Sequence, residues 1–273
     1  MLASRPPVPQ LRSFVRLLWA TAPAGATGSG AFREHVLPTG CMHLALRWSG
    51  PPLRVYAGDA GPEGRVLGHA VVGGVRTSFY AREAGVAAAS AGALLEPGAA
   101  RALFGAGAQE FTGRHEALDN LWGRDAGFCM ERLQAATDPA HALALMEAFL
   151  LERLAPGTGL HPGVAAGLAS LRHGGRVEDA ARASGFSHRH FVARFRDATG
   201  LAPKAHARVL RMQSALGGLA RPGTALADVA LAAGFADQAH FSREFRAFAG
   251  VTPTQWLLAR PLHPNHVPVA AAA

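Results

Sequence analysis

Cysteine, lysine and long apolar runs are scarce in this chain of 273 residues. Its two cysteines, Cys41 and Cys129, cannot build a disulfide framework, so a reducing environment is expected. The first apolar stretch, residues 14–20, is interrupted by Arg16, and no uninterrupted run approaches the roughly 18 residues of a membrane-spanning helix. These absences argue against a disulfide-stabilised secreted protein and against a membrane protein, and they predict a cytoplasmic location.

Signatures of catalysis and of metal binding are also missing. The sequence has no phosphate-binding loop, no Gly-x-Ser-x-Gly elbow and no dinucleotide-binding fingerprint. His35, Cys41 and His43 lie close together, and Cys-x-His places two side chains on one face of a strand, which leaves a metal or thiol sensor open. Their spacing matches none of the strong zinc patterns. We therefore predict that the chain is not an enzyme, binds no metal and needs no cofactor.

Basic residues are concentrated in the second part of the chain. Residues 163–273 carry 13 Arg and Lys against 6 Asp and Glu, whereas residues 1–162 carry 14 against 13. A positive excess on one region is the electrostatic signature of phosphate binding, and it predicts an affinity that falls with salt. A membrane surface would attract the same charge, but no long basic helix with a bulky apolar face is evident.

The same basic region contains a repeat with a period of about 50 residues. The repeat pairs Gly185, Phe191, Phe195, Gly200 and Pro203 with Gly234, Phe241, Phe245, Gly250 and Pro253. In each copy an apolar helix, over residues 177–184 or 226–233, stops at a Gly, and Ser187 or Asp237 is placed to cap the helix that follows. This pattern predicts two helix-turn-helix units.

At about 100° per residue, the second helix of each unit has an aromatic face and an arginine-bearing face. The aromatic faces carry Phe191 and Phe195, and Phe241, Phe245 and Phe248; the opposite faces carry Arg189, Ala193 and Arg196, and Ala239, Arg243 and Arg246. An arginine-bearing helix suits the major groove, where guanidinium pairs with the guanine edge and a small apolar side chain meets a thymine methyl. A plain helical bundle with solvated arginines is the alternative, and the doubling makes it the weaker interpretation.

The residues predicted to contact DNA lie on or beside the arginine-bearing faces. Arg189 and Arg243 are expected to contact bases. Val192, Ala193, Gln238 and Ser242 adjoin them, and His190, Arg196, His240 and Arg246 are placed nearer to phosphates. His188 and His190 cannot chelate one ion, because on a helix they point about 160° apart.

These motifs resemble the DNA-binding domain of AraC-type transcription regulators. The resemblance covers about residues 163–260 and rests on the doubling, the unequal turns and the Gly-x-x-Pro endings. It implies that a long helix joins the two units, and residues 203–216, ended by Gly217-Gly218, fit that helix. It also implies that the units enter successive major grooves, about 34 Å apart, on one face of DNA. Two positions depart from the family pattern. Ala193 stands where the first unit often has Arg, and Leu258 stands where an Arg often follows the aromatic residue, here Trp256.

The first part of the chain has a different texture. Short apolar segments separated by Gly and Pro, at residues 35–37, 42–48, 53–56, 69–72, 77–80 and 86–95, predict the strands of a small barrel or sandwich. Residues 11–19 are expected to form a short helix or a strand. Helices are expected from Ala99 and from Asp138-Pro139. The apolar stripe of the second helix, Leu143, Met146, Leu150 and Leu154, packs on the sheet or on a second copy of the chain.

The strings VLPTGCMHLAL, LEPGAARALFG and LDNLWG are similar to an N-terminal domain of unassigned role that is attached to many AraC-type regulators. That family more often has Asp where His43 stands. The similarity implies a cupin-like barrel that binds a small-molecule effector or mediates dimerisation. It names no ligand.

Together these observations predict an α+β protein with two domains. Residues 1–157 form a β-rich cupin-like barrel or sandwich with helices, residues 158–260 form an all-α double helix-turn-helix domain, and residues 261–273 form a disordered tail. The predicted function is sequence-specific transcription regulation on double-stranded DNA, modulated by a small-molecule effector, with RNA polymerase and a second copy as further partners. The alternative is a metal- or ligand-binding cupin-like protein or enzyme that carries a basic helical domain.

Overall fold

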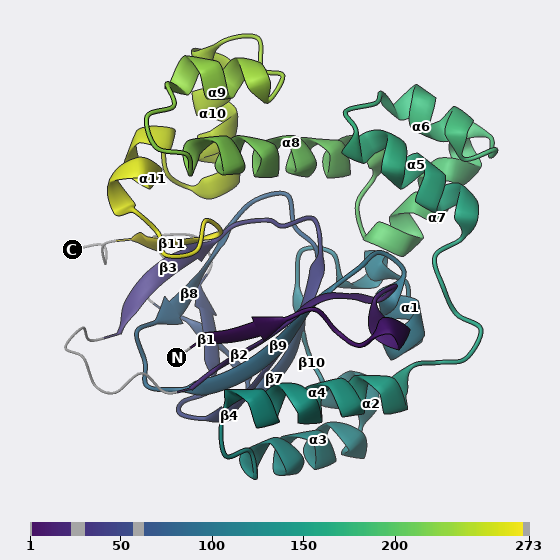
Figure 1. Cartoon of the computed structure of the whole chain (residues 1–273), viewed down its shortest axis with the longest axis vertical. Helices are drawn as coiled ribbons and strands as arrows, with labels where there is room; N and C mark the ends of the chain where they lie inside the picture. Colours follow the sequence, from purple (N-terminus) through teal and green to yellow (C-terminus); the bar gives the residue numbers. More distant parts are fainter. Residues whose placement is uncertain (1, 23–30, 57–62, 270–273) are drawn as a thin grey trace.

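The computed structural model describes residues 2–22, 31–56 and 63–269. Two antiparallel sheets face each other in the first part of the chain, and the helices of the second part lie across one end of them (Figure 1). A β-rich half followed by an all-helical half confirms the predicted α+β fold class.

The larger sheet has six strands in the order β1-β2-β9-β4-β7-β10, and the smaller sheet has five in the order β11-β3-β8-β5-β6. The strands of the larger sheet are β1 (Leu2–Arg5), β2 (Val15–Thr21), β9 (Ala89–Leu95), β4 (Met42–Ser49), β7 (Ala70–Gly73) and β10 (His115–Ala117). Those of the smaller sheet are β11 (His266–Val269), β3 (Phe32–Val36), β8 (Tyr80–Ala84), β5 (Leu53–Tyr56) and β6 (Arg65–Gly68). Short helices connect them: η1 (Pro9–Leu11), α1 (Ala99–Phe104), η2 (Ala108–Phe111) and α2 (Asp119–Trp122).

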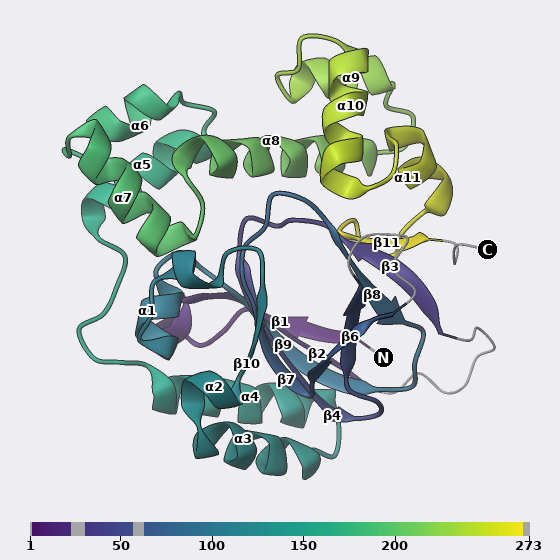
Figure 2. The same cartoon turned by 180° about the vertical axis from the view of Figure 1, so that it is seen from behind.

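The larger sheet separates an apolar outer layer from a polar interior. Along β4, Met42, Leu44 and Leu46 are buried in the main hydrophobic cluster. They lie on the side covered by α3 (Arg124–Gln134) and α4 (Pro139–Arg153), which Figure 2 shows packed below the sheet. His43 and Arg47 alternate with them and face the smaller sheet, because successive side chains of a strand point to opposite faces.

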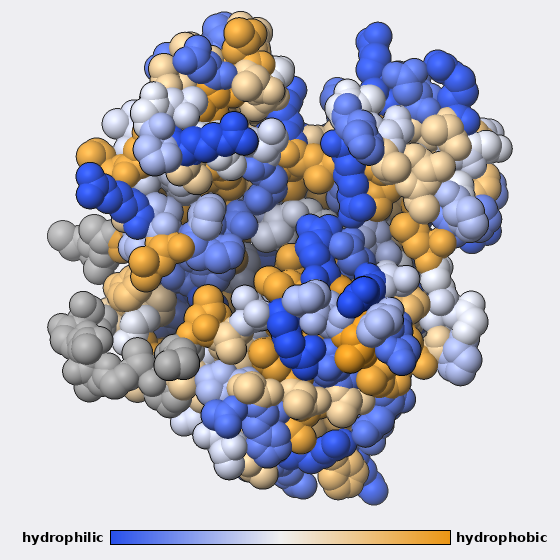
Figure 3. Space-filling view, in the orientation of Figure 1, coloured by the Kyte–Doolittle hydropathy of each residue, from blue (hydrophilic) through white to orange (hydrophobic). Residues whose placement is uncertain are grey.

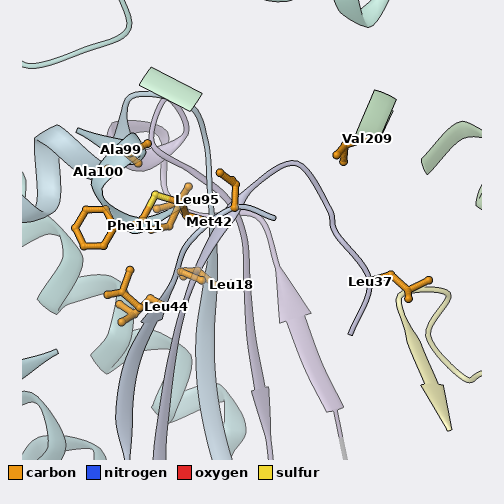
Figure 4. Close-up of a cluster of buried hydrophobic side chains, with 14 of the residues drawn as sticks. Leu18, Leu37, Met42, Leu44, Leu95, Ala99, Ala100, Phe111 and Val209 are labelled. Carbon is orange, nitrogen blue, oxygen red and sulfur yellow. The ribbon is translucent and has the colours of Figure 1, made fainter. Parts of the chain in front are cut away.

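Figure 4 shows part of this hydrophobic cluster at the end of the larger sheet nearest the helical half. Met42, Leu95 and Phe111 meet the start of α1, and Leu18 and Leu44 continue the cluster along the strands. The cluster also takes in Leu143, Met146 and Leu150 of α4. The apolar stripe of α4 therefore packs on the larger sheet of the same chain, which is one of the two arrangements that the sequence left open.

The helical half contains the predicted repeat. Its helices are α5 (Pro162–Arg172), α6 (Val177–Ala183), α7 (His188–Thr199), α8 (Pro203–Leu219), α9 (Leu226–Ala232), α10 (Gln238–Ala249) and α11 (Pro253–Ala259). We call α5 to α7 the first unit and α9 to α11 the second unit; α8 runs between them (Figure 1). The buried side chains of the second unit are continuous with the main cluster, whereas the first unit has a small core of its own.

Two sequence-based predictions are wrong. α8 continues through Gly217 and Gly218, where an end was predicted, because a side chain at Gly218 would lie 3.3 Å from Val229 and the bare backbone lets α9 pack closely. The tail is not disordered as far as Val269. β11 pairs with β3 and Val267 is fully buried, which a count of Pro and Ala could not reveal. Residues 270–273 lie outside the described residues.

Smaller differences concern the ends of strands. Residues 11–19, left open between helix and strand, divide into the end of η1 and the start of β2. Residues 77–79 precede β8 instead of belonging to it, and strands β1, β6 and β10 have no counterpart among the predicted segments. The loop expected at residues 21–30 lies mostly outside the described residues.

The first unit touches the sheet half where α7 ends. Gly200, in the left-handed conformation with φ +80°, lies so close to Val75 that a Cβ atom there would be 2.4 Å from the Val75 side chain. The hydroxyl of Thr112 donates a hydrogen bond of 2.6 Å to the Gly200 carbonyl. Only a glycine both adopts this backbone conformation freely and leaves this space.

The second unit touches the sheet half at the equivalent position of the repeat. Gly250, with φ +76°, lies against Phe79, and a Cβ atom there would be 2.5 Å from the Phe79 ring. The Phe79 N–H donates to the Phe248 carbonyl at 2.9 Å. His35 stacks on Phe79 at 4.1 Å, and its Nδ1 lies 2.8 Å from the Ala249 carbonyl.

The cost of disturbing this contact can be measured with a matched pair of variants. Gly234 and Gly250 share a φ of +76°, but a Cβ atom at Gly234 meets nothing within 4 Å. Gly234→Ala should therefore cost only the left-handed strain, about 1–2 kcal/mol. Gly250→Ala should cost a further ~1–3 kcal/mol from overpacking against Phe79. Urea unfolding of the full chain measures both, and equal losses would show that the contact at Gly250 yields easily.

Candidate nucleic-acid interface

We call α7 and α10 the candidate recognition helices, and both begin with the predicted side-chain cap. Ser187 accepts a hydrogen bond from the His190 N–H at 3.4 Å, and Asp237 accepts one from the His240 N–H at 2.6 Å. Each cap satisfies a backbone donor that the first turn of a helix leaves unpaired. The caps fix where α7 and α10 start, and therefore which residues share a face.

The aromatic faces of these helices are buried. Phe191, Phe195, Phe241, Phe245 and Phe248 are all fully inaccessible. Within each helix the first two phenylalanine rings lie about one turn apart, with centroids 5.4 Å apart in α7 and 5.5 Å apart in α10. Because these rings face inward, the rotation of each helix about its own axis is set by packing.

The opposite faces are exposed, as predicted. Arg189, Ala193 and Arg196 of α7 are exposed, and so are Ala239, Arg243 and Arg246 of α10. Among the described residues none of these four arginines forms an ion pair, and all four side chains are exposed to solvent. Hydrophilic side chains gather on the outward edge of the first unit in the space-filling view (Figure 3).

The flanking residues predicted at the interface are more constrained. The His190 ring stacks on Phe186 at 4.6 Å and accepts a hydrogen bond from Arg194 Nε at 3.0 Å. His240 packs edge-on against Phe235 at 5.6 Å. Both histidines thus brace the turn of their unit, and His240 is only partly exposed.

Three further predicted positions, Val192, Gln238 and Ser242, adjoin the two faces. Val192 and Ser242 are half-buried on the flanks, and Gln238 is exposed at the first position of α10. The Ser242 hydroxyl donates to the Gln238 carbonyl at 2.8 Å. The Ser242 hydroxyl therefore has to break this hydrogen bond before it can donate to a base.

Sequence reasoning missed the ion pairs that hold the recognition helices in place. Arg208 of α8 lies 2.8 Å from Glu244 of α10. Arg101 of α1 donates to Asp197 of α7 at 2.7 Å. The alternation of opposite charges within one helix is visible in a sequence, but pairs between distant segments are not.

The three residues considered as metal or thiol ligands do not meet. His35 packs on Phe79, and His43 lies inside the sandwich beside Tyr80 and His115. Burial raises the pKa of the Cys41 thiol to about 11, which disfavours the reactive thiolate. Within residues 2–22, 31–56 and 63–269 no cluster of three His, Cys, Asp or Glu could hold a metal ion. Over the same ranges no helix is long and apolar enough to cross a bilayer.

Comparison with known proteins separates the chain into the same two parts. Residues 173–259 match the family described as helix-turn-helix domain, and residues 3–117 match a domain of unknown function (DUF6597). No curated relative matches the chain.

Several solved structures are similar. A transcriptional regulator with an AraC-type DNA-binding domain from Chromobacterium violaceum is 23% identical over 37% of this chain and 94% of that chain, with a TM-score of 0.35. The DNA-binding domain of AdpA, in complex with a target DNA, is 28% identical over 36% and 93%, with a TM-score of 0.34. An apo variant of ToxT from Vibrio cholerae is 10% identical over 88% and 97%, with a TM-score of 0.47.

The matched region contains the whole of both recognition helices, with their caps, buried aromatic faces and exposed arginines. The chain therefore carries an AraC-type helix-turn-helix DNA-binding domain in residues 173–259 and a DUF6597 domain in residues 3–117.

Proposed function

We propose that this regulator recognises a specific DNA sequence by placing α7 and α10 in successive major grooves, and that a small-molecule effector in the N-terminal domain modulates binding. The observation that carries the proposal is the equivalence of the two units. Each presents two exposed arginines and a small residue on the face opposite its buried phenylalanines.

The length of the connecting helix supports the two-groove arrangement. α8 has 17 residues, which at 1.5 Å per residue is about 26 Å. The units lie at its two ends (Figure 1). Successive major grooves on one face of DNA are about 34 Å apart, a distance that two units at the ends of such a helix can span.

The proposed roles follow the faces. Arg189 and Arg243 contact base edges, and Val192, Ala193, Gln238 and Ser242 adjoin them. His190, Arg196, His240 and Arg246 lie nearer to phosphates. Arginine in the major groove pairs bidentately with guanine, so these two positions are expected to select it.

We place the domain boundary at residue 157, in the connection between α4 and α5, with 158–260 as the DNA-binding domain. Residues 1–157 would hold the effector or form the contact with a second copy, and RNA polymerase is a further proposed partner. β11, from beyond residue 260, adds its strand to the smaller sheet of the N-terminal domain.

Selection of bound sequences from random duplex DNA at about physiological salt tests the function directly. Two conserved blocks one helical turn apart, with a preference of about 10³ or more over scrambled DNA, are expected. A preference near one, both with and without cell extract metabolites, would contradict sequence-specific recognition.

Replacing Arg243 should affect one base position. Arg243→Ala should cost about 1–3 kcal/mol on the selected duplex and relax discrimination at that position, because the bidentate pair is lost. Binding to a set of single-base variants measures the effect. Arg221→Ala, an exposed arginine in the turn after α8, is the matched control and should leave discrimination unchanged. A uniform loss over all duplexes would assign Arg243 to phosphate instead.

The phosphate contacts have a different signature. Arg196→Ala and Arg246→Ala should each weaken binding to all duplexes alike and reduce the slope of log K against log salt by about 1, because one fewer counterion is released. Titrations at several salt concentrations measure the slope. A change confined to one base position would move either residue to base recognition.

A further inference from the structure

The interior of the sandwich is polar, although facing sheets usually bury apolar side chains between them. His43, Tyr80 and His115 form a ring cluster there, with His115 centroids 5.8 Å from His43 and 4.7 Å from Tyr80. Burial lowers the pKa of His43 to about 4 and that of His115 to about 2, so both rings are neutral. Buried polar groups of this kind call for an explanation beyond stability.

The arginines of this interior outnumber its carboxylates. Arg82 is paired with Glu34, which also contacts His266 at 2.9 Å. Arg47 is buried and donates only to neutral oxygens, at Pro51 and Ser90. Among the described residues, Arg47 thus adds a positive charge between the sheets without a hydrogen bond to a carboxylate.

Arg76 is the arginine best placed to receive an anion. Its Nη2 donates to His115 Nδ1 at 3.0 Å, and its guanidinium lies over the Tyr80 ring at 4.8 Å. Its Nε is buried and has no hydrogen-bond partner in the described part of the chain. By contrast, Arg5, Arg16 and Arg153 each reach a carboxylate. A carboxylate would satisfy Arg76 through two N–H donors.

A cavity of about 180 Å³ opens beside this cluster. His115 and Arg65 form part of its wall, together with the apolar side chains of Val66, Leu67 and Val71. Since His115 Nδ1 accepts from Arg76, the proton of the neutral ring is on Nε2. Glu116 also lines the cavity, but its carboxylate accepts a hydrogen bond from Asn120. The cavity thus brings Arg65 and His115 together with apolar side chains and with the Glu116 carboxylate, and Arg76 is connected to it through His115.

The residues next to Arg76 take part in the contacts with both units, beside other contacts such as the ion pair between Arg101 and Asp197. Residues 74–79 join β7 to β8, and we call them the 74–79 segment. Val75 of this segment lies against Gly200 of the first unit, and Phe79 lies against Gly250 of the second. Arg76, between them, points into the sandwich. One short segment therefore touches the interior and both units.

We propose that the sandwich interior binds a small organic acid through Arg76, and that the 74–79 segment transmits its presence to both helix-turn-helix units. The proposal rests on the proposed function for its effect on DNA. A carboxylate that draws Arg76 away from His115 shifts the backbone that holds Val75 and Phe79, and so changes the docking of α7 and α10.

Butanoate and butanamide test the acidic-ligand step, because they share a shape of suitable size and differ in charge. Butanoate should raise the unfolding temperature of the full chain saturably, by about 2–4 °C, because it binds only the folded state. Butanamide should not. Arg76→Gln should abolish the shift, whereas Arg124→Gln, an exposed arginine on α3, should keep it. Equal shifts from both compounds, or none from butanoate, would overturn the proposal.

Hydrogen exchange in the unmodified protein tests the relay even where Arg76→Gln fails to fold. Butanoate should change the exchange of the Phe79 amide, which donates to Phe248, and of the Gly113 amide, which donates to Val75. The Ala142 amide, which donates to Asp138 at the start of α4, serves as the reference. Stabilisation by butanoate with no change at Phe79 and Gly113 would overturn the relay.

The effect on DNA separates this inference from the proposed function. Butanoate should change the affinity for the selected duplex about fivefold or more, in either direction. If the wild-type protein binds the selected duplex specifically and butanoate does not change that affinity, transmission through the 74–79 segment is overturned and the proposed function is not. A protein without sequence preference would overturn the proposed function, and the thermal and exchange measurements would still decide the inference.

Discussion

Burial of the paired phenylalanines is the constraint on which the DNA-binding half depends. Phe191 with Phe195, and Phe241 with Phe245, lie four residues apart and are fully buried. Residues at this spacing share one face of a helix, so their burial fixes the rotation of α7 and α10. Exposure of Arg189 and Arg243 is the consequence. Each fully buried aromatic ring contributes about 1.5–3 kcal/mol from burial alone, so turning the arginines inward would forfeit several such contributions.

The sequence predicted those features that are determined by residues close together in the chain, and it failed for features determined by distant segments. The caps at Ser187 and Asp237, the buried faces and the exposed arginines follow from neighbours within one helix, and all are found where the spacing placed them. The base and phosphate roles of the predicted site residues stay predictions, because a protein structure without DNA does not test them. The end of α8 and the state of the tail were wrong because each is decided elsewhere: by the approach of α9 to Gly218, and by β3, which is more than 200 residues from β11 in the chain.

The polar interior was also beyond local reasoning. Alternation along β4 predicts two faces, but it does not tell which face points into the space between the sheets. In the structure the apolar face of β4 looks outward to α3 and α4, and the face with His43 looks inward. This arrangement is stable because α3 and α4 cover the apolar face of the sheet and bury its side chains. His43 fits tightly there, since a Cβ atom at Gly73 would be 2.0 Å from the nearest atom of the His43 ring.

The contacts at Val75 and Phe79 constrain how the two recognition helices reach DNA. Four residues separate them, and because an extended chain spans at most about 3.6 Å per residue, their Cα atoms are no more than ~14 Å apart. Each side chain touches the glycine that ends a recognition helix, so the C-terminal ends of α7 and α10 are held closer together than the ~34 Å between successive grooves. Entry into both grooves therefore requires that the helices diverge toward their N-terminal ends or that one end leaves the 74–79 segment. In both cases the position of the 74–79 segment determines how far α7 and α10 must move from the positions seen here before both can enter DNA grooves.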